Sequence, residues 1–342
     1  MNEKKVIGYV GTGDLGKMRE EDIRKLDVIN IAFGHIRENE TVWENGSGTE
    51  GNLERIRRIH PEIKIILSIG GWSADGFSQA AMTESTREKA AKSAAALVAE
   101  HKLDGIDIDW EYPCFALAGI AADMRDKENF TLFLAKLRQE LDALGSGKML
   151  TIAAGGDTYF TLHTDMAQAQ QYLDYVQLMT YDLQGGFVKV TGHHASLYPG
   201  TTNLFDVCVD KAVKAFQEAG VPAEKLIVGV PFYARLWKEV KGGGDGLGRE
   251  AGTVGMGGPG YQELAQSYID KNGYRRYWDD AGKAPYLFNG ECFISYDDGE
   301  SLQAKADYVR EKGLGGIMFW EYGCDPEGIL LNCIYEAFRA QA

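Results

Sequence analysis

Runs of apolar residues rich in valine and isoleucine recur along the chain and alternate with segments of helical periodicity. Near-continuous apolar runs are typical of strands buried on both faces, as in parallel sheets. They predict eight strands, at residues 5–10, 28–34, 64–71, 105–112, 149–156, 175–182, 226–233 and 315–322. Strands and helices that alternate in this way predict an α/β fold, a (β/α)8 TIM barrel. A doubly wound sheet is the alternative, but GYVGTGDLG after the first run matches its glycine fingerprint poorly.

Helix signals flank several of these runs. Ser85 and Glu88 have capping-box spacing, which predicts that a helix starts at Ser85. Apolar residues at helical spacing predict a second helix within residues 126–144. A third segment, residues 206–220, stops at Gly220, a common helix terminator.

One connection is too long for a barrel loop. Residues 238–294, between the seventh and eighth predicted strands, are glycine-rich at first and then rich in aromatic residues. Because βα loops are usually short, this length predicts a small α+β insertion on the loop face of the barrel. The glycines lack the lysine and spacing of a phosphate-binding loop. We therefore expect one catalytic barrel over residues 1–342 with the insertion inside it.

Composition and charge narrow the possible partners. The chain has 342 residues, 25% of them charged, and a net charge of −14. This acidic balance lacks the electrostatic footprint for nucleic acid or an anionic membrane, so we expect neither as a partner. No apolar run reaches the roughly 18 residues that a membrane span needs.

The first ten residues, MNEKKVIGYV, lack the apolar region and cleavage site of a signal peptide. The compartment stays open between the cytoplasm and secretion with a signal removed. Five cysteines show no metal or redox spacing, so we expect reduced, structural thiols. We also expect a monomer that uses no cofactor and no metal, with no linker or second module after Ala342.

The stretch LDGIDIDWEYP, residues 103–113, places four acids among apolar residues. Because strand side chains alternate, Asp107, Asp109 and Glu111 share the face toward the barrel interior, whereas Trp110 faces the helices. The row climbs toward the C-terminal strand end, where barrel active sites lie. Neighbouring carboxylates raise one another's pKa, and burial raises it further, so one stays protonated as a general acid requires. The alternatives are a structural acid cluster and a divalent metal site, although no histidine lies at a predicted strand end.

Residues 104–111 match the D-x-x-D-x-D-x-E pattern of glycoside hydrolase family 18, the chitinase family. Other segments resemble motifs of the family in the expected order, and they are SIGG (68–71), QLMTYD (177–182), PFYAR (231–235), YDD (296–298) and the eighth-strand Trp320. The chain resembles a bacterial-type chitinase from its first strand to its last helix. The loop at residues 114–125 is more apolar than this resemblance leads us to expect.

The resemblance implies a retaining hydrolase of β-1,4-linked N-acetylglucosamine polymers and oligomers, such as chitin and chito-oligosaccharides. In this family the acetamido group of the substrate serves as the nucleophile. Glu111 would be the general acid and later the base, and Asp109 would accept the acetamido N–H. Asp107 would share a proton with Asp109, and Tyr181 would donate to the acetamido oxygen.

The resemblance and the strand ends together also imply a sugar-binding groove. Its expected substrate-binding residues are Tyr9, Phe33, Gly71, Trp72, Tyr112, Met179, Asp182, Tyr233, Arg235 and Trp320. Trp320 would lie beneath the sugar at the −1 position. His193 and His194 are expected to shape a loop.

Other functions remain open from the sequence. An endo-β-N-acetylglucosaminidase acting on N-glycans and a peptidoglycan-fragment hydrolase would share the mechanism. A carbohydrate-binding lectin on the same barrel would lack the acid, and the presence of Glu111 argues against it. A metal-dependent hydrolase would lose activity in chelator. Endo or exo action is undetermined, and we expect soluble chito-oligosaccharides to be better substrates than crystalline chitin.

Overall fold

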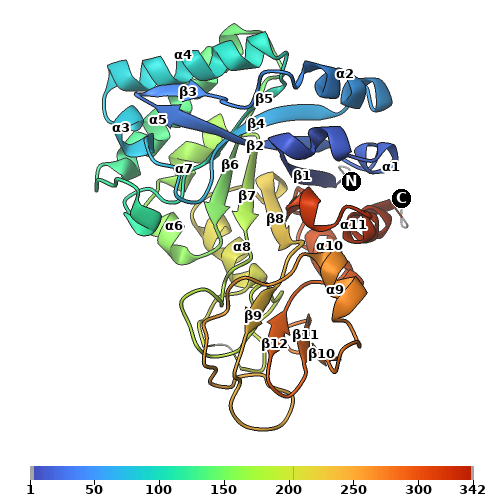
Figure 1. Ribbon diagram of the computed structural model, residues 1–342. Helices are drawn as coiled ribbons and strands as arrows, with labels where there is room; N and C mark the ends of the chain where they lie inside the picture. Colours follow the sequence, from blue (N-terminus) through green and yellow to red (C-terminus); the bar gives the residue numbers. More distant parts are fainter. Residues whose placement is uncertain (1–3, 203, 340–342) are drawn as a thin grey trace.

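The computed structural model describes residues 4–202 and 204–339, and its centre is a closed parallel barrel (Figure 1). The barrel strands are β1 (Lys5–Gly11), β2 (Val28–Arg37), β4 (Lys64–Gly70), β5 (Gly105–Asp109), β6 (Met149–Gly155), β7 (Tyr175–Met179), β8 (Leu226–Pro231) and β13 (Gly316–Trp320). Each strand pairs with the next in this order, and β13 pairs with β1 to close the barrel. The predicted TIM barrel and its eight strands are therefore confirmed. The predicted domain limits at residues 1 and 342 lie outside the described residues.

Helices surround the barrel (Figure 1). They are α1 (Glu20–Ile23), α2 (Glu50–Ile59), α3 (Phe77–Ala81), α4 (Glu84–Glu100), α5 (Asp126–Ala143), α6 (Thr158–Leu162), α7 (Met166–Ala169), α8 (Val209–Glu218), α9 (Tyr261–Ser267), α10 (Gly299–Glu311) and α11 (Ile329–Arg339). Short 3-10 helices are η1 (Thr12–Lys17), η2 (Leu117–Gly119), η3 (Gln170–Tyr172), η4 (Ala223–Lys225) and η5 (Tyr322–Cys324). No helix among the described residues is both long enough and apolar enough to span a membrane.

The start of α4 differs from the prediction. Thr83, rather than Ser85, is the N-cap, and its hydroxyl accepts a hydrogen bond from the backbone N–H of Thr86. The hydroxyl of Thr86 in turn accepts from the backbone N–H of Thr83. Two threonines therefore close a capping box two residues earlier than the serine and glutamate signal indicates.

Side chains of β5 point alternately to two regions, the core between the strands and the helices and the interior of the barrel. Ile106, Ile108 and Trp110 belong to the core between the strands and the helices, and the Trp110 ring stacks on Phe77 at 5.3 Å. The interior of the barrel has its own apolar cluster, which includes Ile7, Tyr9, Ile66, Ala153, Met179, Ile227 and Met318. Asp107 points into this interior, so the predicted division of β5 into an acidic inner face and an apolar outer face is correct.

A second sheet lies beyond the barrel (Figure 1). Its strands are β9 (Arg235–Trp237), β10 (Arg275–Asp279), β11 (Ala284–Phe288) and β12 (Phe293–Ser295), paired antiparallel in the order β10–β11–β12–β9. A short β3 (Glu40–Val42) pairs only with β2. The loop after β7 is fastened to this second sheet, because His193 bonds Asp279 of β10 at 3.0 Å. The sheet and this loop together build one wall above the barrel mouth.

Candidate active site

A cleft of about 850 Å³ opens at the C-terminal ends of the barrel strands. This volume lies within the range of small-molecule sites. Predicted site residues that line it are Phe33, Trp72, Asp109, Glu111, Tyr112, Met179, Tyr181, Asp182, Tyr233, Arg235 and Trp320. The structure thus brings together every predicted site residue except Asp107, Tyr9 and Gly71, which do not line the cleft.

Asp107 lies fully buried at the bottom of the acid row. Its Oδ2 accepts from the hydroxyls of Tyr9 (2.8 Å) and Ser68 (2.7 Å), and its Oδ1 accepts from Thr151 (2.6 Å) and Gln177 (2.9 Å). Burial raises the pKa of Asp107, and these four donors oppose that shift. The proton that Asp107 is expected to share with Asp109 stays a prediction. Both oxygens of Asp107 are already occupied.

Tyr9 and Gly71 support the site from outside the cleft. Tyr9 is only 1% exposed and directs its hydroxyl to the acid row. A Cβ on Gly71 would lie 2.7 Å from the Phe33 ring, and a Cβ on Gly70 would lie 1.9 Å from the carbonyl oxygen of Asp109. Both glycines have positive φ, at 124° and 92° for Gly70 and Gly71. The glycine pair therefore allows the end of β4 to approach β5 and Phe33 closely.

Asp109 and Glu111 form the upper part of the row. Asp109 is 4% exposed, and its Oδ1 has no hydrogen-bond partner among the described residues. Burial and the charges of Glu111 and Asp107 raise the pKa of Asp109 well above its usual value. Burial and the charge of Asp182 raise the pKa of Glu111 to about 7, against a lowering contribution from Tyr112. Because both groups resist ionisation, the pair retains a proton near neutral pH.

Asp182 lies on the opposite wall of the cleft, where several neighbouring side chains bind it. It follows β7 with a φ of 58°, a left-handed conformation that aspartate tolerates better than most residues. Arg235 binds both of its carboxylate oxygens, and the Tyr233 hydroxyl donates to Oδ2 at 2.9 Å. Burial would raise the pKa of Asp182, but the nearby imidazole of His194 and the hydrogen bonds from Arg235 outweigh burial and hold it well below its usual range. The charge of Asp182 is therefore fixed at neutral pH.

Aromatic side chains supply the apolar surface of the cleft. The Trp320 ring packs against Phe33 in a stacked geometry at 5.4 Å and against Tyr9 at 5.6 Å. Trp72 stands at the rim with 54% of its surface exposed. Sugar rings present apolar faces that stack on such surfaces.

The cleft also contains apolar residues outside the predicted site. Phe187 and Met256 are 78% and 58% exposed and come from the loop after β7 and from the glycine-rich segment. Phe115 and Leu117 line the other side. These two belong to the loop at residues 114–125, whose apolar character was the available signal. No comparable signal marked Phe187 or Met256, because their place depends on how two long loops fold together.

The described part of the chain holds no group of three or more histidine, cysteine, aspartate or glutamate side chains placed to bind a metal ion. The groups present can instead donate a proton from Glu111 and accept an N–H at Asp109. Tyr181 adds a hydroxyl to the lining of the same cleft. Proton donation, amide recognition and an apolar platform are the requirements of glycoside cleavage assisted by a neighbouring amide.

A parallel barrel with this carboxyl row at its mouth defines a class of enzyme, the glycoside hydrolases. The comparison with known families is specific. The profile of Glycosyl hydrolases family 18 matches residues 5–325, and the chain belongs to that family.

Known relatives agree with this assignment. The chain is 40% identical to Chitinase A1 of Niallia circulans over 309 residues, which cover 84% of this chain and 44% of the relative. It is 30% identical to Chitinase B of Serratia marcescens, over 98% of this chain and 84% of the relative. Among solved structures, a family 18 N-acetylglucosaminidase from Paenibacillus barengoltzii matches with a TM-score of 0.95 and 50% identity. That match covers 98% of this chain and 99% of the other.

Proposed function

We propose that this protein hydrolyses β-1,4-linked N-acetylglucosamine chains, such as chitin and chito-oligosaccharides, with retention of the β-anomer and assistance from the substrate. The observation that carries the proposal is the difference in hydrogen bonding between the carboxyls of Asp107 and Asp109. Asp107 has four hydrogen-bond donors, whereas the buried Oδ1 of Asp109 has no partner among the described residues. A buried acceptor without a hydrogen-bond partner lowers the stability of the fold unless a ligand donates to it. The acetamido N–H of the substrate is a suitable donor.

In the first step Glu111 donates its proton to the glycosidic oxygen, and the bond between that oxygen and C1 breaks. The acetamido oxygen forms a new bond to C1 and gives a bicyclic oxazolinium ion. Asp109 accepts the N–H and offsets the developing positive charge, and Tyr181 orients the acetamido oxygen. Charge stabilisation of this kind is usually the largest contribution to catalysis.

In the second step a water molecule attacks C1 on the face that the leaving group vacated. Glu111, now ionised, accepts a proton from this water, and the bond from C1 to the acetamido oxygen breaks. Because C1 is displaced twice, the product keeps the β configuration. A pKa of about 7 suits Glu111 to both roles, since a catalytic acid and base works best near the operating pH.

A second candidate is the release of single N-acetylglucosamine units. It is favoured by the 50% identity to the N-acetylglucosaminidase from Paenibacillus barengoltzii, which spans nearly the whole of both chains. The chemistry at C1 would be the same. The two candidates differ in how many sugars bind on either side of the cleaved bond.

Product analysis on N-acetylglucosamine oligomers of two to six units tests the proposal. Rapid cleavage of the hexamer with disaccharide products supports a chitinase, whereas release of monomer from every length, the dimer included, supports the second candidate. NMR of the fresh product should detect the β-anomer first. The Glu111→Gln variant is the matched control. If the wild-type protein cleaves none of these oligomers, or if the α-anomer appears first, the proposed function is wrong.

A further inference from the structure

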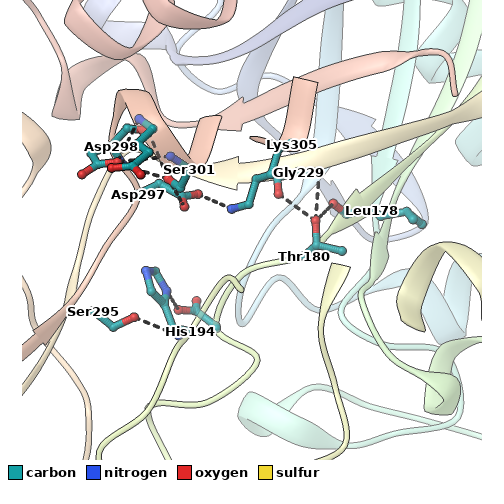
Figure 2. A network of polar contacts seen from close by, with 11 residues as sticks. Leu178, Thr180, His194, Gly229, Ser295, Asp297, Asp298, Ser301 and Lys305 are labelled. Carbon is teal, nitrogen blue, oxygen red and sulfur yellow. Dashed lines mark hydrogen bonds and ion pairs between the residues drawn. The ribbon is translucent and has the colours of Figure 1, made fainter. Parts of the chain in front are cut away.

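His194 lies behind the cleft, in the loop after β7, and is fully buried. Its Nδ1 is 3.5 Å from Oδ1 of Asp182. Its backbone N–H donates to the Ser295 hydroxyl at 3.0 Å, and its carbonyl accepts from Leu183 at 3.0 Å. Figure 2 shows His194 beside Ser295, close to a cluster that contains Asp297 and Lys305. The backbone of His194 is therefore fixed on both sides, and its imidazole faces the carboxylate of Asp182.

The proton on this imidazole can be assigned from its surroundings. Burial lowers the pKa of His194, and Arg235 lowers it further, while Asp182 and Asp297 act in the opposite direction. The charge of Asp297 is itself paired with the buried ammonium of Lys305. The net shift is downward, so the ring is neutral at neutral pH.

A neutral imidazole carries one N–H, and a lone pair directed at a carboxylate would be repelled. Nδ1 faces the Asp182 carboxylate at 3.5 Å, a contact too long to count as a hydrogen bond, and Nε2 faces no polar partner among the described residues. The proton therefore belongs on Nδ1. His194 therefore presents an N–H to Asp182 and does not act as a general base.

The other partners of Asp182 are in a different situation. Tyr233 and Arg235 line the cleft together with Asp182, so a bound sugar competes for their donors. His194 does not line the cleft. Its donor stays on Asp182 whether the cleft is empty or filled.

We propose that His194 is a positioning residue, whose Nδ1–H holds the Asp182 carboxylate in place while Tyr233 and Arg235 engage the substrate. The inference rests on the proposed function, because it concerns the wall that faces Glu111. Asp182 has an unusual backbone conformation and an exposed carboxylate. Without His194 it loses a buried N–H that faces it at 3.5 Å from a side that does not line the cleft.

Two variants separate donation from packing. Asn in place of His194 retains an N–H close to the position of Nδ1 but leaves a cavity against the Tyr233 ring, which lies 5.6 Å away. Leu fills more of the space but donates nothing. We expect His194→Leu to lower kcat on chito-oligosaccharides about 10-fold, the lower end of the loss for an N–H directed at a charged group because the contact is long, with little change in KM. We expect His194→Asn to stay within about 3-fold of wild type in kcat while it unfolds at a lower temperature than His194→Leu.

A purely structural role predicts the reverse order for activity, with kcat following stability in both variants. That result, or a wild-type kcat in folded His194→Leu, would overturn the inference. If neither variant folds, the ring nitrogens of the wild-type protein decide the question, because ¹⁵N-labelled histidine distinguishes the two neutral tautomers by NMR. An Nε2–H tautomer at His194 contradicts the proposal. Wild-type hydrolysis is measured in parallel, so its absence would refute the proposed function and not the role of His194 alone.

Discussion

Replacement of Glu111 by glutamine tests the role of its transferable proton without changing the shape of the side chain. Glutamine keeps the size of the side chain and can still donate a hydrogen bond, but it has no transferable proton. We expect hydrolysis of chito-oligosaccharides to fall by about 10²–10⁴, the range typical of general acid–base catalysis. Binding should survive, because Asp109, Tyr181 and the aromatic surface of the cleft remain.

The same substitution has a pH-dependent effect on stability that follows from the structure. The pKa of Glu111 is raised from 4.5 to about 7, so the folded state binds more protons than the unfolded state in this window. The free energy of unfolding of the wild type should therefore fall as the pH rises from about 4.5 to about 7. At 1.36 kcal/mol per pKa unit, the fall amounts to at most about 3 kcal/mol. The glutamine variant lacks this titration.

Unfolding in urea at pH 4.5 and pH 8 measures the effect, together with kcat on two substrates. The variant should match the wild type at pH 4.5 and be more stable at pH 8. An aryl glycoside with a good leaving group should lose less in its first step than an oligosaccharide, since its oxygen needs little protonation. Glu100→Gln, at the exposed end of α4, is the matched control and should change neither property. Near-wild-type hydrolysis by folded Glu111→Gln, or an equal stability difference at both pH values, would refute the reasoning.

Three further outcomes test other parts of the site. Trp320→Ala should reduce kcat/KM by the equivalent of about 1–3 kcal/mol through lost stacking, and an unchanged kcat/KM in a folded variant would remove Trp320 from the sugar site. Asp109→Asn should lower kcat by about 10² or more, because the acetamido N–H loses its charged acceptor. The same variant should move the basic limb of the pH profile to lower pH, because one charge that repels an ionised Glu111 is gone. A pH profile that stays in place would contradict the coupling of the two carboxyls. A thiazoline analogue of the bicyclic intermediate should inhibit competitively, and turnover of substrates without the acetamido group alongside no inhibition would exclude assistance from the substrate.

Much of the barrel and the centre of the site could be predicted because they follow from local periodicity. The alternation in residues 105–111 places Asp107 and Asp109 inside the barrel and Trp110 on its outer face, independently of how the neighbouring strands pair. The apolar runs likewise identify the barrel strands without knowledge of their register. The bounds of the insertion at residues 238–294 and the catalytic roles of the site residues stay predictions.

Features that depend on contacts between distant segments could not be predicted. Asp107 finds its donors on four other strands, so these hydrogen bonds depend on the register of the closed barrel. His194 meets Asp182 only because the loop after β7 is fastened to Ser295 of β12. The start of α4 is a different, local failure, since Thr83 and Ser85 are both suitable capping residues two positions apart and the structure uses Thr83.

The hydrogen bonds to Asp107 bind β5 to β1, β4, β6 and β7 inside the barrel. Loss of the carboxylate would leave four buried donors unpaired, at about 1–3 kcal/mol each, which is comparable with the 5–15 kcal/mol of a typical domain. An inactive Asp107 variant therefore says little about chemistry unless its folding is measured. The rim residues Phe187 and Met256 lie under no such constraint. Mutation of these two residues can be used to seek new sugar specificities. Asp107, in contrast, tolerates little change because the folded barrel depends on its hydrogen bonds.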